Sequence, residues 1–168
     1  MSIQRILSGG QTGVDRAALD FAIARQIPHG GWCPAGRRAA DGVLDARYQL
    51  LETESSGYRQ RTKRNVLDAD ATLILYRGRL EGGSLLTRDL AAGHGKPLLL
   101  CDLHAPTEEL LAAWQGWLLS PHFSQPCALG RFDGRRSSQV AQAADSADFG
   151  QAPASALEQG ACGRVDGV

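Results

Sequence analysis

The chain has 168 residues, of which 43% are hydrophobic, and its 18 lysines and arginines balance 18 aspartates and glutamates. This length suits one domain with one core, and a zero net charge gives no general attraction to nucleic acid or to an anionic membrane. No apolar run approaches the roughly 20 residues that cross a bilayer, and the first residues lack a signal-peptide pattern, so we expect a cytoplasmic protein without nucleic-acid or membrane partners.

The first predicted elements are a strand, a glycine turn and a helix. Apolar residues 3–7 are followed at once by Ser8-Gly9-Gly10-Gln11-Thr12-Gly13, and small and aromatic apolar residues then recur on one helix face. A short second strand near residues 29–33 leads into a polar, glycine-bearing loop over residues 34–42. Such a loop is too irregular to be core, and we interpret it as part of a ligand site.

The middle of the chain continues this alternation of helices and strands. Helical spacing over residues 58–68 puts Arg61 and Asn65 on one face. Strands are predicted at residues 71–76 and 98–101, and helices from Ser84 to about Gly93 and from about residue 107 to 117. Short strands that alternate with helices predict an α/β domain with an open, mainly parallel sheet.

The composition changes near residue 128. The last 41 residues have few leucines and valines and no isoleucine, and they are rich in Ala, Gly, Gln and Ser, so they can bury little surface. We therefore divide the chain into a ligand-binding domain, residues 1–127, and a tail, residues 128–168. The tail is expected to be disordered or loosely helical and not to extend the core.

The cysteines do not predict a metal site. The four cysteines lie far apart, and none has a Cys-x-x-Cys partner or a histidine at ligand spacing: Cys33, Cys101, Cys127 and Cys162. Their density is also low for a secreted disulfide scaffold. We interpret them as reduced thiols in or near the core and assign no metal ligands.

Two glycine turns are the strongest signals of chemistry. In the first, residues 8–13, the glycines allow close approach of a ligand, and the N–H groups that open the following helix favour an anion such as phosphate. It lacks the Walker lysine, and its glycines do not fit the dinucleotide-binding spacing. The second turn, Gly82-Gly83-Ser84, follows another strand. Parallel strands end at one edge of a sheet, so the turns predict one anion or nucleotide-like site, with simple tight turns as the alternative.

Polar side chains near the turns could complete this site. Arg37, Arg38 and Arg61 offer planar donor groups for an oxyanion, and solvated surface positions are their alternative. Asn65 can pair with the edge of a heterocycle, and Asp15 could contact the ligand or cap its helix. The sequence shows no Ser-His-Asp set, carboxylate pair or histidine cluster, so we expect a binding protein rather than an enzyme.

The chain resembles the molybdenum carrier protein family in an ordered series of blocks: residues 8–20, 31–38, 41–42, 52–53, 58, 61–62, 65–66, 82–84 and 87. That family is similar to a wider Rossmann-like group that includes the lysine-decarboxylase-like nucleotide phosphoribohydrolases. The resemblance covers about residues 3–119. It implies a Rossmann-like sheet flanked by helices and a cytoplasmic, homo-oligomeric carrier of the molybdenum cofactor, a pterin with a phosphate and a dithiolene-bound metal.

The resemblance also implies which residues bind the ligand. The two turns would hold the phosphate from opposite sides, while Arg38, Arg61 and Asn65 would line the cleft. The implied cofactor-binding residues are Gly9, Gly10, Gln11, Thr12, Gly13, Asp15, Arg38, Arg61, Asn65, Gly82, Gly83, Ser84 and Thr87.

Two other functions stay open. The hydrolase relatives carry Pro-Gly-Gly-x-Gly-Thr-x-x-Glu with a catalytic acid, and here Gly82 and Gly83 fit while Asp89 stands for the glutamate. A nucleoside-monophosphate phosphoribohydrolase would then use Asp89 with Arg61. The other alternative is an interaction module that senses a nucleotide-like ligand. Carriers continue with an Asn-Val-Ala-Gly-Pro-Arg-like segment that nothing after Gln125 matches, so the chain either lacks the final sheet element or has a rearranged carboxyl end.

Overall fold

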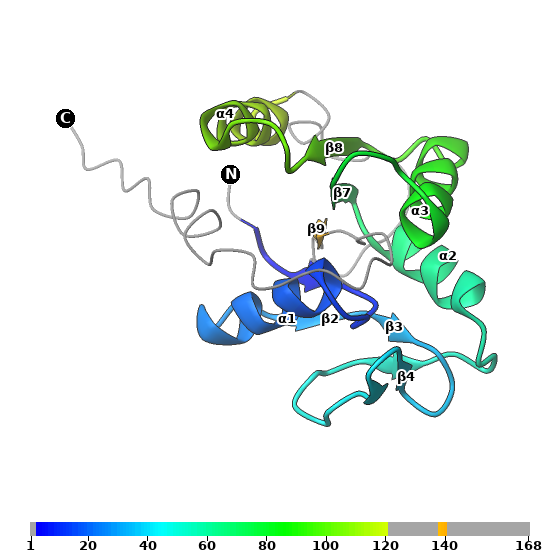
Figure 1. Ribbon diagram of the computed structural model, residues 1–168. Coiled ribbons are helices and arrows are strands. Elements are labelled where there is room, and N and C mark those ends of the chain that lie inside the picture. Colours follow the sequence, from blue (N-terminus) through cyan, green and yellow to red (C-terminus); the bar gives the residue numbers. More distant parts are fainter. Residues whose placement is uncertain (1–2, 121–137, 141–168) are drawn as a thin grey trace, which may run out of the picture.

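The structure is a computed structural model that describes residues 3–120 and, as backbone, Ser138–Val140. Its main sheet has the strand order β2-β1-β9-β7-β8, and every neighbouring pair is parallel (Figure 1). The five strands are β1 (Ile6–Leu7), β2 (His29–Gly30), β7 (Ala71–Tyr76), β8 (Leu98–Asp102) and β9 (Ser138–Val140). The expected open, parallel, Rossmann-like sheet is confirmed.

Four helices flank this sheet: α1 (Val14–Ala24), α2 (Tyr58–Asp68), α3 (Gly82–Gly93) and α4 (Thr107–Leu118). Apolar side chains of α1 and α4 meet one core cluster, which includes Ile6, Leu73 and Cys101 of the strands. Helices α2 and α3 pack against each other on the other side of the sheet (Figure 1). Among the described helices, none has the length and apolar content that a bilayer crossing requires.

The loop that follows the second strand builds a small core of its own. It contains the short pair β3 (Trp32–Cys33) with β6 (Leu51–Glu52) and the hairpin β4 (Arg38–Ala39) with β5 (Gly42–Val43). Its buried side chains, with one from α1, are Leu19, Cys33, Leu44, Tyr48 and Leu50. The hairpin itself, residues 38–43, remains largely exposed, as expected for the polar loop predicted over residues 34–42. The buried side chains Leu44, Tyr48 and Leu50 follow that predicted loop.

The sequence offers Arg37 as a donor for an oxyanion, but the structure shows that it stabilises this loop instead. Its guanidinium donates hydrogen bonds of 2.8–3.3 Å to four backbone carbonyls, those of Leu44, Asp45, Tyr48 and Leu50. A guanidinium that satisfies four carbonyls has little donor capacity left for an oxyanion. Arg37 is therefore a structural clamp.

Strand β9 lies in the centre of the sheet and was not predicted. Ile6 of β1 pairs with Ser138, and Leu73 of β7 pairs with Val140. The sequence predicts a largely disordered or loosely helical tail, and these three residues instead form a strand of the sheet. A short central strand is held by backbone hydrogen bonds to both neighbours, and such bonds do not depend on side-chain type, so the composition of the segment does not predict them. The rest of the tail, residues 128–137 and 141–168, lies outside the described residues.

Candidate functional site

Both glycine turns lie at the same edge of the main sheet. The first follows the carboxyl end of β1, the second follows that of β7, and β9 runs parallel between the two strands. The loops that leave the carboxyl ends of parallel strands form the usual ligand-binding edge of such a sheet. The predicted juxtaposition of the turns therefore agrees with the topology.

The first turn brings its backbone close to other groups. Gly10 and Gly13 have φ values of 70° and 85°, a region that favours glycine. A Cβ at Gly9 would overlap the Arg61 guanidinium. Gly13 is the N-cap of α1, and no side chain caps the first turn of this helix. The amino terminus of α1 therefore presents its dipole and N–H groups at the sheet edge.

Asp15 and Arg61 form a buried ion pair beneath this turn. Asp15 Oδ2 lies 3.1 Å from Arg61 Nη1, and the two side chains are 1% and 5% exposed. The Gln11 N–H donates to the same Oδ2 over 3.4 Å. Burial raises the pKa of Asp15 to about 6, although the Arg61 charge acts in the opposite direction. Within the described residues, Asp15 Oδ1 has no hydrogen-bond partner.

The second turn is more open than the first. Gly82 has a φ of 49°, and a Cβ there would meet no atom within 4 Å. Helix α3 begins at this residue without a side-chain cap. In contrast, Ser84 and Thr87 are fully buried, and Thr87 Oγ1 donates to the Gly83 carbonyl over 2.8 Å. Gly82 and Gly83 are thus the accessible part of this turn.

Asn65 is used by the fold. Its side-chain amide bonds to both backbone groups of Trp32, and it is fully buried. A Cβ on the adjacent Gly31 would overlap the Ser8 carbonyl oxygen, so β3 passes tightly against the start of the first turn. The structure therefore places Asn65 behind the turn.

The hairpin β4–β5 is tied to the first turn by two residues. Gln11 Oε1 accepts hydrogen bonds from the N–H groups of Thr12 and Ala40, over 3.1 and 2.7 Å. Arg16 donates to the Gly10 carbonyl over 3.1 Å and binds both carboxylate oxygens of Asp41, at 3.0 and 3.2 Å. Arg38 belongs to the same hairpin, and its side chain is exposed.

Sequence reasoning leaves Arg16 open between solvent and an anion and assigns no role to Asp41. Both lie within matching blocks of the resemblance, and this was the signal available for them. A tie between residues 25 positions apart depends on how the hairpin folds back, which local patterns do not report.

The hydrolase alternative is not supported by a contact between its two residues. Asp89 is exposed and accepts hydrogen bonds from its neighbour Arg88, over 2.7 and 2.9 Å. Arg61 lies in the buried pair with Asp15. Within residues 3–120, no three His, Cys, Asp or Glu side chains are grouped as a metal site.

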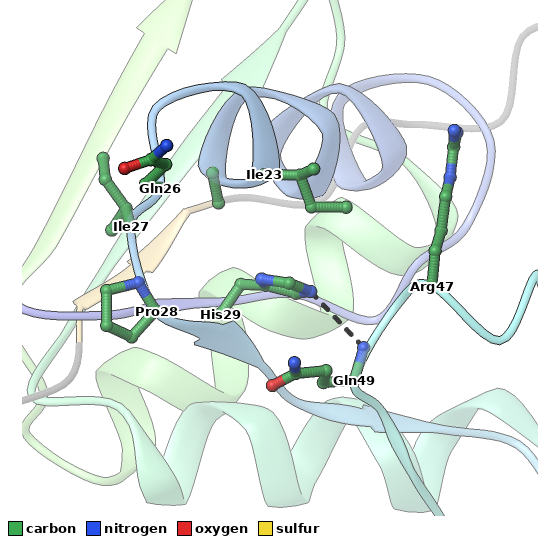
Figure 2. A pocket seen from close by; sticks show the side chains of 8 residues that line it. Ile23, Gln26, Ile27, Pro28, His29, Arg47 and Gln49 are labelled. Atoms are coloured by element: carbon green, nitrogen blue, oxygen red, sulfur yellow. Dashed lines mark hydrogen bonds between the residues drawn. The ribbon is translucent and has the colours of Figure 1, made fainter.

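A surface hollow lies elsewhere on the protein. Figure 2 shows Ile23, Ile27 and Pro28 around it, with His29 Nε2 accepting a hydrogen bond of 3.4 Å from the Gln49 N–H. It forms where α1 ends and β2 begins. This is the amino-terminal edge of the strands, opposite the glycine turns, so the hollow is separate from the candidate site.

Comparisons with known proteins agree with the sequence resemblance. A family model described as the circularly permutated YpsA SLOG family matches residues 6–148. The chain is also similar to a crystal structure named "putative molybdenum carrier protein" from Syntrophus aciditrophicus SB. The two share 43% identity with a TM-score of 0.73, over 83% of this chain and 81% of the other. No curated protein matches.

Proposed function

The chain belongs to the circularly permutated YpsA family of SLOG proteins, and from this membership we propose that it is a carrier for a phosphate-bearing heterocycle. The solved relative is named a molybdenum carrier protein, which makes the molybdenum cofactor the ligand of choice. In this proposal the cofactor is cargo: its pterin carries the metal on its own dithiolene, so the chain need not supply metal ligands.

The observation that carries the proposal is the pair of helix amino termini, α1 and α3, on one edge of the sheet. Neither Gly13 nor Glu81, their N-cap residues, makes a side-chain cap. N–H groups and helix dipoles of this kind bind phosphate without help from a side-chain charge. The open space at Gly82 leaves room for a group of that size to approach α3.

The predicted site residues separate into two groups by burial. We propose as ligand contacts the residues that are not buried: Gln11, Thr12, Gly13, Arg38, Gly82 and Gly83. The remaining predicted residues are buried behind the turns and would position them: Gly9, Gly10, Asp15, Arg61, Asn65, Ser84 and Thr87. Arg38 is the exposed cation of the first group and would meet the anionic tail of the ligand.

The test compares two substitutions at Gly82, Asn and Asp, whose side chains have the same shape and differ in charge. Asn and Asp tolerate a φ of 49° better than other residues, so both variants should fold. Protein is purified from a molybdate-fed host, and its molybdenum and its oxidised pterin fluorescence are measured. Wild type and Gly82→Asn should retain both, whereas Gly82→Asp should lose at least about tenfold, because its carboxylate repels an anion.

Two results would contradict the proposal. One is folded wild-type protein that holds neither molybdenum nor pterin after growth on molybdate. The other is equal loading of the Asp and Asn variants, which would place the anion elsewhere. Adenine-type absorbance without molybdenum would instead favour the nucleotide-sensing alternative.

A further inference from the structure

The Asp15–Arg61 pair gives the first glycine turn one buried positive charge and one buried negative charge. We propose that an anion bound at this turn is accompanied by the uptake of one proton on Asp15. This inference rests on the proposed function and adds to it, because it says how the ligand would be taken up and released.

The geometry makes Asp15 a competitor of the ligand. Asp15 is the second residue of α1, and its Oδ2 accepts the Gln11 N–H from within the turn. A Cβ at Gly9 would lie 3.0 Å from this oxygen, so the carboxylate packs directly against the turn backbone. An anion held by the same turn and the same helix terminus would therefore lie close to a second negative group.

The charges that face Asp15 come from two helices. Arg61 of α2 contacts it directly. Arg16 of α1 lowers its pKa from a greater distance, but both terminal nitrogens of Arg16 bind Asp41. The Ser8 hydroxyl donates to the Asp15 backbone carbonyl, not to the carboxylate. Arg61 is thus the close cation, and it can balance one of the two negative groups.

A proton on Asp15 restores the balance. The carboxylate takes H⁺ from solvent and one O–H bond forms, so the bound anion no longer lies beside a second negative charge. The proton can bind Oδ1, because Oδ2 already accepts hydrogen bonds from the Gln11 N–H and from Arg61, whereas the described residues offer Oδ1 no donor. Burial has already brought the pKa of Asp15 to about 6, so a nearby negative charge that raises it by about one further unit leaves half of the carboxyl groups protonated at pH 7.

The test is calorimetric titration of the full chain with sulfate at pH 7, in PIPES and in imidazole buffer. Sulfate stays a dianion at this pH, so a heat that depends on the ionisation enthalpy of the buffer reports proton uptake by the protein. Wild type should take up between about half a proton and one proton per sulfate. Asp15→Asn should show no buffer dependence and should bind sulfate on the order of tenfold more tightly at pH 7.5, since it is already neutral.

Matched measurements keep the outcome clear. Asp20→Asn changes an exposed carboxylate of the same helix and should behave like wild type. Carboxyl carbon NMR of aspartate-labelled wild type follows Asp15 without any substitution, and sulfate should move its titration midpoint up by at least about one pH unit. Sulfate binding without proton uptake would overturn this inference alone. Folded wild type that binds no sulfate at all would overturn the proposed anion site as well.

Discussion

Asn65 holds the backbone of Trp32 through both of its hydrogen-bonding groups. The Trp32 N–H donates to Asn65 Oδ1 over 2.8 Å, and Asn65 Nδ2 donates to the Trp32 carbonyl over 3.0 Å. This bond pair joins α2 to β3. Asn65→Ala should lower the free energy of unfolding by about 2–3 kcal/mol, because it leaves two partly buried backbone groups without their partner. Urea denaturation measures this, with the exposed Lys63→Ala on the same helix as a control that should change stability by less than about 0.5 kcal/mol.

The Asp15 carboxyl should give the protein an unusual pH dependence. Its folded-state pKa is raised from 3.8 to about 6, so the native state binds its proton more tightly than the unfolded state. This contribution to stability is fully present below pH 4 and is lost as the pH rises through about 6, by about 3 kcal/mol in total. Urea titrations of wild type and Asp15→Asn at pH 4.5 and 7.5 should reveal it as a difference in slope.

Asp41, whose pKa is shifted in the opposite direction to that of Asp15, serves as the control for that measurement. Arg16 lowers the pKa of Asp41, so Asp41 stabilises the protein above its unfolded pKa and loses this effect as the pH falls. The Asp41 side chain is 51% exposed, so its effect should stay below about 1 kcal/mol. Identical pH slopes for wild type and Asp15→Asn would contradict the assignment of the raised pKa to Asp15.

Two glycines with similar backbone angles should respond differently to alanine. Gly31 and Gly42 have φ values of 129° and 124°. A Cβ at Gly31 would overlap the Ser8 carbonyl, whereas one at Gly42 would meet no atom within 4 Å. Gly42→Ala should cost about 1–2 kcal/mol from backbone strain, and Gly31→Ala about 3 kcal/mol or more. Thermal melts of both variants test this, and equal losses would show that the overlap at Gly31 is relieved without cost.

Substitutions at the neighbouring residues Arg37 and Arg38 should affect different properties, stability for Arg37 and anion binding for Arg38. Arg37→Lys cannot reach four carbonyls with one ammonium group and should lower stability by about 2 kcal/mol. Arg38→Ala removes an exposed side chain and should change stability by less than about 0.5 kcal/mol. If the proposed site is correct, Arg38→Ala weakens sulfate binding severalfold in the same calorimetric assay. Unchanged affinity would remove Arg38 from the site.

A proline in strand β9 should disrupt the sheet. Gln139 pairs with Leu7 of β1 on one side and with Thr72 of β7 on the other. Gln139→Pro removes a backbone donor from a central strand and should cost about 3 kcal/mol or more, whereas Gln139→Ala keeps the N–H and should cost less than about 1 kcal/mol. Circular dichroism with urea denaturation distinguishes the two. Equal stability would mean that β9 contributes nothing measurable to the sheet.

The sequence predicted the elements whose signals are local. Helical spacing over residues 58–68 matches α2, and the apolar run at residues 71–76 matches β7. Strand β9 was not predicted because it has three residues, two of them polar, and because its pairing partners lie far away along the chain. The same reason applies to the break between β2 and β3, where Gly31 fits against the Ser8 carbonyl.

The positions of the two glycine turns could be predicted from sequence, but the contacts of the side chains around them could not. Glycines between a strand and a helix indicate an anion site wherever the helix packs. Whether Arg61 points to a ligand or to Asp15, 46 positions away, depends on how α2 lies against α1. Spacing within one helix says nothing about this. Asn65 shows the same limit, because its amide bonds to a strand 33 positions earlier.

The place of β9 has a consequence for synthesis on the ribosome. Ile6 and Ala71 both pair with Ser138, so the central strand of the sheet is translated after both of its neighbours, β1 and β7. Until then the nascent chain presents two unpaired strand edges, the kind of surface that recruits chaperones or joins other chains. Contacts of such long sequence separation also form slowly. A ribosome that stalls before residue 138 would therefore release a chain that cannot close its own sheet.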